Sequence, residues 1–154
     1  MSAGIKGKQQ RNLLLGSAPV AKAVPTLSAT SFSTFTVAGG EVLITGLWLK
    51  VTTSITTDTG TLALNNVPTT GNTVTLVTAT DLGTTDTVAG SVVGVSPVGT
   101  VTAAQSFLRG GRIDLNAVAT TGIVNLVGAS SVTGGVTVFC TYVPLTDGAT
   151  LVAS

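Results

Sequence analysis

The chain has 154 residues, of which 8% are charged and 44% are hydrophobic, and its formal net charge is +1. This length fits one domain that can bury a core without disulfides or metal, and the small net charge excludes a long-range field that would steer the protein to a polyanion or an anionic membrane. Charged residues make up roughly a quarter of an ordinary soluble domain. The surface of this protein is therefore either hydrated through its hydroxyl groups or covered by partners.

Residues 1–30 differ in composition from the rest of the chain, and we expect them to form an extended arm. They contain four of the seven basic residues, two prolines and no acidic residue. Leu13, Leu14 and Leu15 form the one apolar cluster of this segment. A disordered terminus is the alternative. If the arm is ordered, a neighbouring subunit is the surface expected to order it.

From Ser31 onward, apolar and polar residues alternate with the period of two that is typical of β-strands. Thr and Val, the two commonest residues, are β-branched and fit a pleated surface. Turn signals such as Asn65-Asn66 separate the strands, and the only helical structure expected is one turn near residues 101–108. The expected strands are 32–37, 42–51, 61–64, 73–79, 87–95, 98–102, 113–116, 122–127 and 135–143.

Short strands at this spacing predict an all-β fold. Their number favours a jelly-roll-like β-sandwich over residues 31–154, preceded by the extended N-terminal arm of residues 1–30. One strand carries a further signal. Its apolar set changes phase by one residue after Gly46, which places Trp48 on the face opposite Leu47 and predicts a β-bulge at that glycine.

The chain lacks the side chains from which most catalytic and metal sites are made. It contains no His, one Cys, six acidic residues and seven basic residues. A Ser or Thr nucleophile would have no imidazole base, and one Cys without His cannot form a zinc site. No glycine pair is followed by the Lys and Ser/Thr of a phosphate loop. We therefore expect a protein that is not an enzyme and needs no cofactor or metal.

Three small groups of residues admit both a chemical and a structural interpretation. Cys140 is a nucleophile, an intermolecular disulfide partner or, in the preferred interpretation, a buried apolar group. Asp81 and Asp86 suggest a Ca²⁺ loop, but their spacing does not match an EF-hand and the closing Glu is missing, so a turn is expected. Arg109 and Arg112 flank two glycines and could contact phosphate, or form a solvated corner or an interface pair.

Nucleic acid and membrane are not expected as direct partners. Aromatic residues make up 4% of the chain, which leaves no stacking platform for single strands. No segment reaches the roughly 18 consecutive apolar residues that are needed to span a bilayer.

Two segments stand out, Gly39-Gly40-Glu41-Val42-Leu43-Ile44-Thr45-Gly46-Leu47 and Thr141-Tyr142-Val143-Pro144-Leu145-Thr146-Asp147-Gly148-Ala149-Thr150-Leu151-Val152-Ala153. They resemble small virion proteins of tailed bacteriophages, of the capsid decoration or cement type and related head proteins. Members of that group are small β-rich proteins that oligomerise over the joints between capsid subunits. No catalytic residues belong to the pattern, and the basic arm before Ser31 departs from it.

The resemblance implies a non-enzymatic capsid decoration protein that stabilises the phage head lattice. It would be a dimer or trimer, bound to the major capsid protein of a virion that is assembled in the host cytoplasm. A tail, fibre or adaptor component is an alternative. A carbohydrate-binding β-sandwich module is another, although the chain has few aromatic residues to stack on sugar rings. A coat subunit with an internal basic arm is a third, with few bases for packaging nucleic acid.

Several residues are expected at interfaces. In the arm, three bases would meet an acidic capsid surface and three leucines would fill an apolar groove. Trp48 is either an interface anchor or, in the preferred interpretation, the centre of the core. The chain's end, Leu151-Val152-Ala153, either docks against a neighbour or completes the protein's own sheet. The full set is Lys6, Lys8, Arg11, Leu13, Leu14, Leu15, Trp48, Arg109, Arg112, Leu151 and Val152.

Overall fold

The computed structural model describes residues 18–56, 60–96 and 105–154, and all regular structure in these ranges is β-strand. The expected all-β fold is therefore confirmed. The strands are β1 (Val20–Val24), β2 (Ser31–Ala38), β3 (Val42–Thr53), β4 (Thr61–Pro68), β5 (Val74–Asp81), β6 (Val92–Val95), β7 (Gln105–Arg109), β8 (Asp114–Ala119), β9 (Gly122–Ala129), β10 (Gly135–Pro144) and β11 (Thr150–Ala153).

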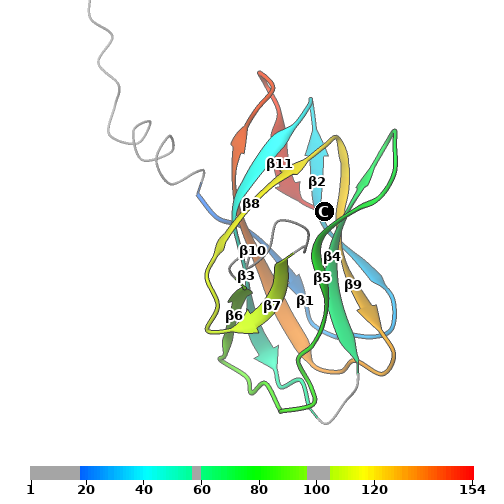
Figure 1. The fold of residues 1–154 in the computed structure, drawn as a ribbon, viewed down its shortest axis with the longest axis vertical. Coiled ribbons are helices and arrows are strands. Elements are labelled where there is room, and N and C mark those ends of the chain that lie inside the picture. The colour runs from blue at the N-terminus through cyan, green and yellow to red at the C-terminus, as the bar shows by residue number, and fades with distance from the viewer. Residues whose placement is uncertain (1–17, 57–59, 97–104) are drawn as a thin grey trace, which may run out of the picture.

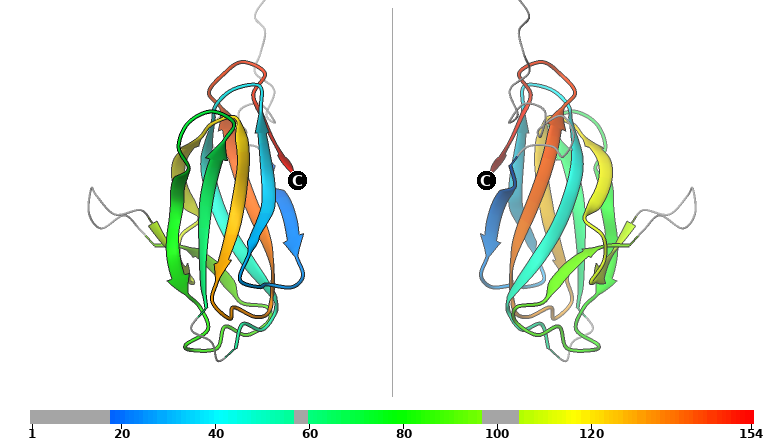
Figure 2. Two further views of the ribbon diagram at one scale, coloured as in Figure 1. Left: turned by 90° about the vertical axis from the view of Figure 1, so that its right-hand side faces the viewer. Right: turned by 90° about the vertical axis from the view of Figure 1, so that its left-hand side faces the viewer.

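The strands follow one path, in the order β1-β10-β3-β6-β7-β5-β4-β9-β2-β11, with β8 paired to β3. One layer, here called sheet A, contains β1, β10, β3, β8 and β6, and the other, sheet B, contains β5, β4, β9, β2 and β11. Strand β7 joins the layers, since it pairs antiparallel with β6 and parallel with β5. The result is a nearly closed, barrel-like sandwich (Figures 1 and 2). The jelly-roll strand order stays a prediction.

The core between the two layers is almost entirely aliphatic, as the low aromatic content requires. Buried and outward positions alternate along the strands, for example at Leu62, Leu64 and Asn66 of β4, because successive side chains of a strand point to opposite faces. The largest fully buried side chains are Phe35, Ile44, Leu47, Leu49, Ile55, Leu62, Leu64, Leu126 and Leu151.

The phase change in β3 is a β-bulge, as predicted, with Thr45 as the extra residue next to the expected glycine. Ile44 pairs with Tyr142 and Gly46 pairs with Thr141, so Thr45 has no counterpart on β10. Its hydroxyl group lies 3.0 Å from that of Thr141. The bulge lets both halves of a twelve-residue strand face the core, although their apolar residues are out of phase.

The structure differs from the expected arm in its last third, because Val20–Val24 is a strand of sheet A. Val20 pairs with Cys140 and Val24 pairs with Val136, so β1 covers the edge of β10. Val24 is buried in the core. The alternating burial of its side chains stabilises β1. The prolines before and after this segment had argued against a strand in the sequence.

Two local predictions were wrong. Asn65 and Asn66 are not in a turn but inside β4, where Asn66 is 1% exposed and its Nδ2 donates to Thr120 Oγ1 at 3.1 Å. The described part of the expected helical turn, residues 105–108, belongs to strand β7, because β5 and β6 offer it two edges to pair with. The strand expected at 98–102 lies outside the described residues.

Candidate interaction surfaces

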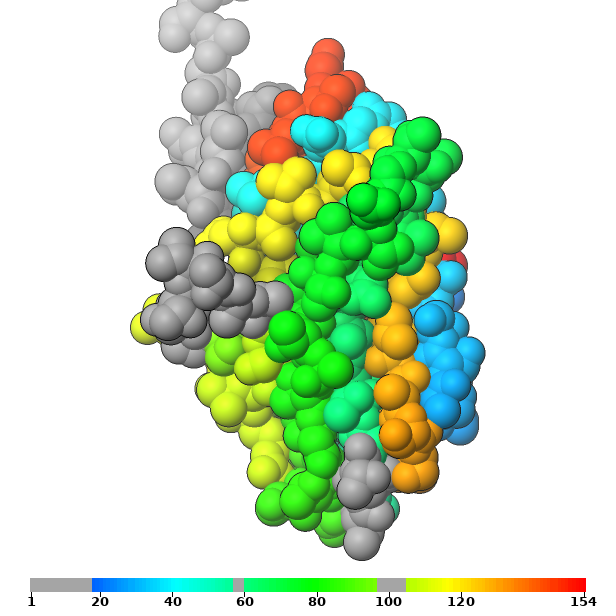
Figure 3. Space-filling view, turned by 45° about the vertical axis from the view of Figure 1, so that its right-hand side comes forward, coloured from blue at the N-terminus to red at the C-terminus, as the bar shows by residue number. Residues whose placement is uncertain are grey.

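The outer face of sheet B carries three cross-strand rows of uncharged side chains, which we call the neutral face. The first row runs Val152–Thr36–Ile123–Val67 over β11, β2, β9 and β4. The second runs Ser33–Asn125–Asn65–Thr75, and the third runs Ser31–Val127–Ala63. Figure 3 looks onto this side, where β5, β4 and β9 lie as adjacent stripes.

The neutral face combines exposed β-branched groups with hydroxyl and carboxamide groups. Val67, Ile123 and Val152 are 38%, 39% and 52% exposed, and they lie in one row. Such a row resembles the mixed apolar and polar composition of protein interfaces, which are depleted in charge at their centre. The sequence signal was present, since residues 31–38, 61–68, 122–129 and 150–153 contain no charged residue. The register was needed to show that these segments are neighbours.

Asn65 and Asn125 stand opposite each other in the middle of the neutral face. The Oδ1 atom of each is shielded from solvent and has no hydrogen-bond partner. Unpaired carboxamide acceptors cost free energy. A donor that reached these oxygen atoms would remove that cost.

The outer face of sheet A carries an aromatic pair. Trp48 of β3 and Phe139 of β10 are directly opposite, with ring centroids 5.2 Å apart and planes within 3° of parallel. The preferred interpretation of Trp48 as the core centre is wrong: the ring is half-buried on the outer side, because Leu47 and Leu49 take the two core positions beside it. Trp48 remains a candidate interface anchor.

Arg109 and Arg112 have different surroundings in the structure. The Nη1 atom of Arg109 donates to the carbonyl oxygens of Thr85 at 2.8 Å and Asp86 at 3.1 Å. Arg109 therefore supports a turn of its own chain. Arg112 is exposed, and its backbone exchanges two hydrogen bonds with Val95, at 2.6 and 3.0 Å.

The segment Leu151–Ala153 completes the protein's own sheet, which decides between the two alternatives raised by its sequence. Strand β11 pairs with β2, and Leu151 is 1% exposed in the core. Leu151 is therefore not an interface residue, whereas Val152 belongs to the neutral face. The other expected contacts, at Lys6, Lys8, Arg11 and Leu13–Leu15, lie outside the described residues.

Cys140 is a buried apolar group, as preferred. It is fully buried on β10, and burial raises the pKa of its thiol to about 12. A thiol with this pKa is almost entirely protonated at neutral pH and is a poor nucleophile. The raised value also means that this group favours the folded state below the ordinary thiol pKa and loses that contribution as the pH rises toward 12.

Asp81 caps a turn, as expected. Its Oδ1 accepts hydrogen bonds from the backbone N–H groups of Gly83 at 2.8 Å and Thr84 at 2.9 Å, and its Oδ2 accepts one from the Thr84 hydroxyl. These bonds, led by that of the Thr84 side chain, hold the pKa of the Asp81 carboxyl below its usual value. Within the described ranges, no group of three or more His, Cys, Asp or Glu side chains could hold a metal ion.

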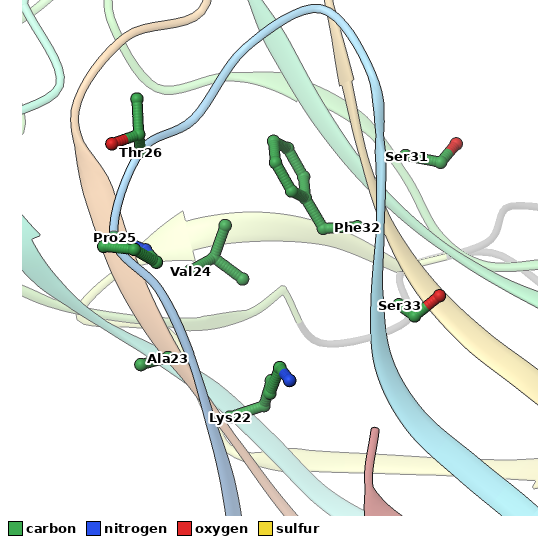
Figure 4. Close-up of a pocket in the computed structure, with 8 residues that line it drawn as sticks. All are labelled: Lys22, Ala23, Val24, Pro25, Thr26, Ser31, Phe32 and Ser33. Atoms are coloured by element: carbon green, nitrogen blue, oxygen red, sulfur yellow. The ribbon is translucent and has the colours of Figure 1, made fainter.

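A cavity of about 450 Å³ lies between β1 and the first half of β2, and no sequence pattern had predicted it. We call it the seam cavity. Val24 and Phe32 point into it from opposite walls, with Lys22 beside them, while the hydroxyl groups of Ser31 and Ser33 point away (Figure 4). Its lining residues are Lys22, Ala23, Val24, Pro25, Thr26, Ser31, Phe32 and Ser33.

No protein-family model, curated protein or solved structure matches this chain. In the part of the chain that the structure describes, no helix has the length and apolar character to cross a membrane. Function is therefore inferred from the neutral face, the aromatic pair and the seam cavity.

Proposed function

We propose that this protein is a non-enzymatic structural component of a virus particle, of the capsid decoration or cement type. It self-associates as a dimer or trimer and binds the major capsid protein in the virion, which is assembled in the host cytoplasm. The observation that carries the proposal is the neutral face, a broad uncharged surface across five strands of sheet B.

The neutral face supports adhesion because covering it removes no charge from water. Burying an ionised side chain costs several kcal/mol unless it is paired, and the three rows contain none. Their hydroxyl and carboxamide groups can form hydrogen bonds with a partner or with trapped water. In an oligomer on a repeating lattice, many weak contacts of this kind combine into strong attachment.

The resemblance to phage virion proteins supports the choice of a capsid partner. The two segments that carry the resemblance lie together, since the backbone N–H groups of Leu145 and Thr146 donate to the carbonyl oxygen of Glu41 at 2.9 and 3.2 Å. The Thr146 hydroxyl accepts a further bond from the Glu41 N–H at 3.1 Å. The two segments are therefore neighbours in the fold, and one partner surface could contact both of them.

The proposal is tested by placing a charge in the centre of the neutral face. Ile123→Lys should weaken self-association or attachment to capsids by at least about tenfold, because covering an unpaired ammonium group costs more than about 1.4 kcal/mol. Sedimentation velocity measures the first effect and co-sedimentation with purified particles measures the second. Ile123 is 39% exposed, so the fold should tolerate the change.

Leu145→Lys is the matched control, since Leu145 is 52% exposed and lies off the neutral face. It should associate and attach like the unmodified protein. Equal attachment of both variants would contradict the proposed role of the face. Absence of the protein from purified particles would contradict the virion assignment, and density for it on the tail rather than the head in electron cryomicroscopy would favour the tail alternative.

The aromatic pair favours a second candidate, a carbohydrate-binding module. Trp48 and Phe139 are partly exposed on an outer sheet face, where aromatic rings stack on sugars in such modules. Their mutual stacking uses one face of each ring and leaves little platform. A shift of Trp48 fluorescence on titration with soluble polysaccharides, lost in Phe139→Ala, would support this candidate over the structural one.

A further inference from the structure

We infer that the seam cavity is a docking site for a β-strand donated by a second copy of this chain, and that the donated strand is the segment around Leu13–Leu15. The inference extends the self-association in the proposed function. The seam cavity and the neutral face share Ser31 and Ser33. The inference depends on unpaired strand edges and on Val24 and Phe32, whereas the neutral face depends on outward side chains, so either can fail without the other.

The cavity lies where two strand edges lack a partner among the described residues. Strand β1 pairs on one side only, with β10. On β2, residues 31–33 pair only with β9, because β11 covers β2 only from Phe35 to Ala38. The last contact on that side is the bond from the Ser154 N–H to the Thr34 carbonyl oxygen, at 3.1 Å. Unpaired strand edges of this kind are templates for another strand.

The side chains between these edges suit an apolar strand. Val24 and Phe32 form opposite walls, and the volume of about 450 Å³ falls within the range of ligand sites. The ammonium group of Lys22 is already bound to the Ser154 carbonyl oxygen, so it does not project into the cavity as a free charge. An incoming strand would pair its backbone with both edges and place every second side chain against Val24 and Phe32.

The segment before β1 has the sequence of such a strand. From Lys8 to Leu15 it contains neither Pro nor Gly, so each residue can donate a backbone hydrogen bond. Leu13 and Leu15 would point to one side, into the cavity, and Leu14 to the other. Eight extended residues span about 26 Å, which exceeds the length of a five-residue strand such as β1.

Geometry favours donation to a second copy over folding back in the same copy. A reversal through Gly16–Pro19 would place Leu15 opposite Val20 and Leu13 opposite Lys22. That part of β1 lies beside β11, where the Lys22–Ser154 contact already occupies the space between the two strands. The leucines would not reach Val24 and Phe32. A strand from another molecule has no such constraint and can lie alongside the lower half of β1.

Disulfide cross-linking of the full-length protein tests the inference. Leu14→Cys is mixed with Ser33→Cys or Ser31→Cys, so that a bond between them can form only between two molecules. Strand pairing brings Cα atoms to about 5.5 Å, which a disulfide can bridge. We expect a dimer band without reductant and the 14–33 or 14–31 linked peptide by mass spectrometry. Native Cys140 is buried and does not compete.

Val88→Cys is the control and takes the place of the Ser variants in the mixture. Its site is 60% exposed and lies away from the seam cavity, so it should give no specific dimer. Cross-linking to Val88→Cys at the same rate would overturn the inference, as would no cross-link at either Ser position. A fast-migrating monomer with an internal disulfide in the Leu14→Cys/Ser33→Cys double variant would show folding back in the same copy instead.

A second pair of variants tests the apolar fit. Leu13→Asp/Leu15→Asp should weaken the dimer at least tenfold in sedimentation velocity, whereas Gln10→Asp/Asn12→Asp carries the same added charge on the opposite face of the strand and should have little effect. Equal effects of the two pairs would contradict the assignment of the leucines. The Ile123→Lys variant should retain the cross-link. Loss of the neutral-face contacts alone would therefore not contradict the docking of the strand.

Discussion

The two sheets meet along two sides of the molecule, and the sides are closed by different means. On one side, β7 pairs with both β6 and β5, and the carbonyl oxygen of Ser106 accepts a bond from the Ser96 N–H at 2.8 Å. Phe107 fills the space beneath and is 2% exposed. On the other side, β1 and β11 are joined by the Lys22–Ser154 contact, above the seam cavity.

The first side is closed by backbone pairing, whereas the second side has an opening with room for a partner. Backbone pairing of β7 with both β6 and β5 occupies the middle of both edges, where another strand would have to bind. A single side-chain contact leaves edges that an extended segment can pair with. Substitutions on the first side should therefore lower the free energy of unfolding strongly. Substitutions on the second side should lower it little in the free protein.

The largest effect is expected on the closed side from Phe107→Ala. Removing this buried ring leaves a cavity and should lower the free energy of unfolding by about 3–5 kcal/mol. Urea denaturation measures the loss. Leu108→Ala is the neighbouring control, since Leu108 is 47% exposed and should cost far less. Equal losses in the two variants would mean that Phe107 does not hold this side together.

A smaller effect is expected from Gly94→Ala, also on the closed side. A methyl group at Gly94 would overlap the carbonyl oxygens of Arg112 and Gly111, and those atoms belong to backbone that cannot move aside freely. We expect a loss of about 1–3 kcal/mol, the usual cost of overpacking. Val92→Ala, on the same strand but 50% exposed, is the control in the same urea titration. An unchanged midpoint for Gly94→Ala would show that β6 and the Gly111–Arg112 backbone are loosely packed.

The smallest effect is expected on the open side from Lys22→Met. The variant keeps an apolar stem and removes one partly exposed hydrogen bond, so the loss should stay below about 1 kcal/mol. Thermal unfolding of dilute protein measures it. A loss as large as that of Phe107→Ala would contradict the comparison, because the Lys22 contact would then be holding β1 in place.

Much of the fold could be predicted from the sequence because alternation reports directly on which face of a strand is buried. The β3 phase change followed from this alone, and the burial of Cys140 followed from its apolar surroundings in the sequence and from the absence of His. Strand β1 could not be predicted, since its five residues include Lys22 and its partner β10 is remote in the chain. Asn66 resembled a turn residue because a carboxamide buried beside Thr120 leaves no signal in composition.

The interaction surfaces were less predictable than the core. The alternation had placed Trp48 opposite Leu47, yet the core was the preferred interpretation, and the stacking on Phe139 depends on strand pairing. The rows of the neutral face likewise exist only once β2, β4, β9 and β11 are in register. The seam cavity depends on where β11 ends along β2, a feature of length and register that no single segment contains.

The pairing of β1 with β10 also has a consequence for biosynthesis. Val20, which leaves the ribosome early, has its neighbour at Cys140, and Lys22 meets a residue 132 positions away. Strand β10 pairs with both β1 and β3, so neither pairing in sheet A can form until nearly the whole polypeptide has been translated. Such distant pairings slow folding because the loop must close before the contacts form. During that interval the nascent chain presents bare apolar strands, and its yield in the cell should depend on temperature and on chaperone supply.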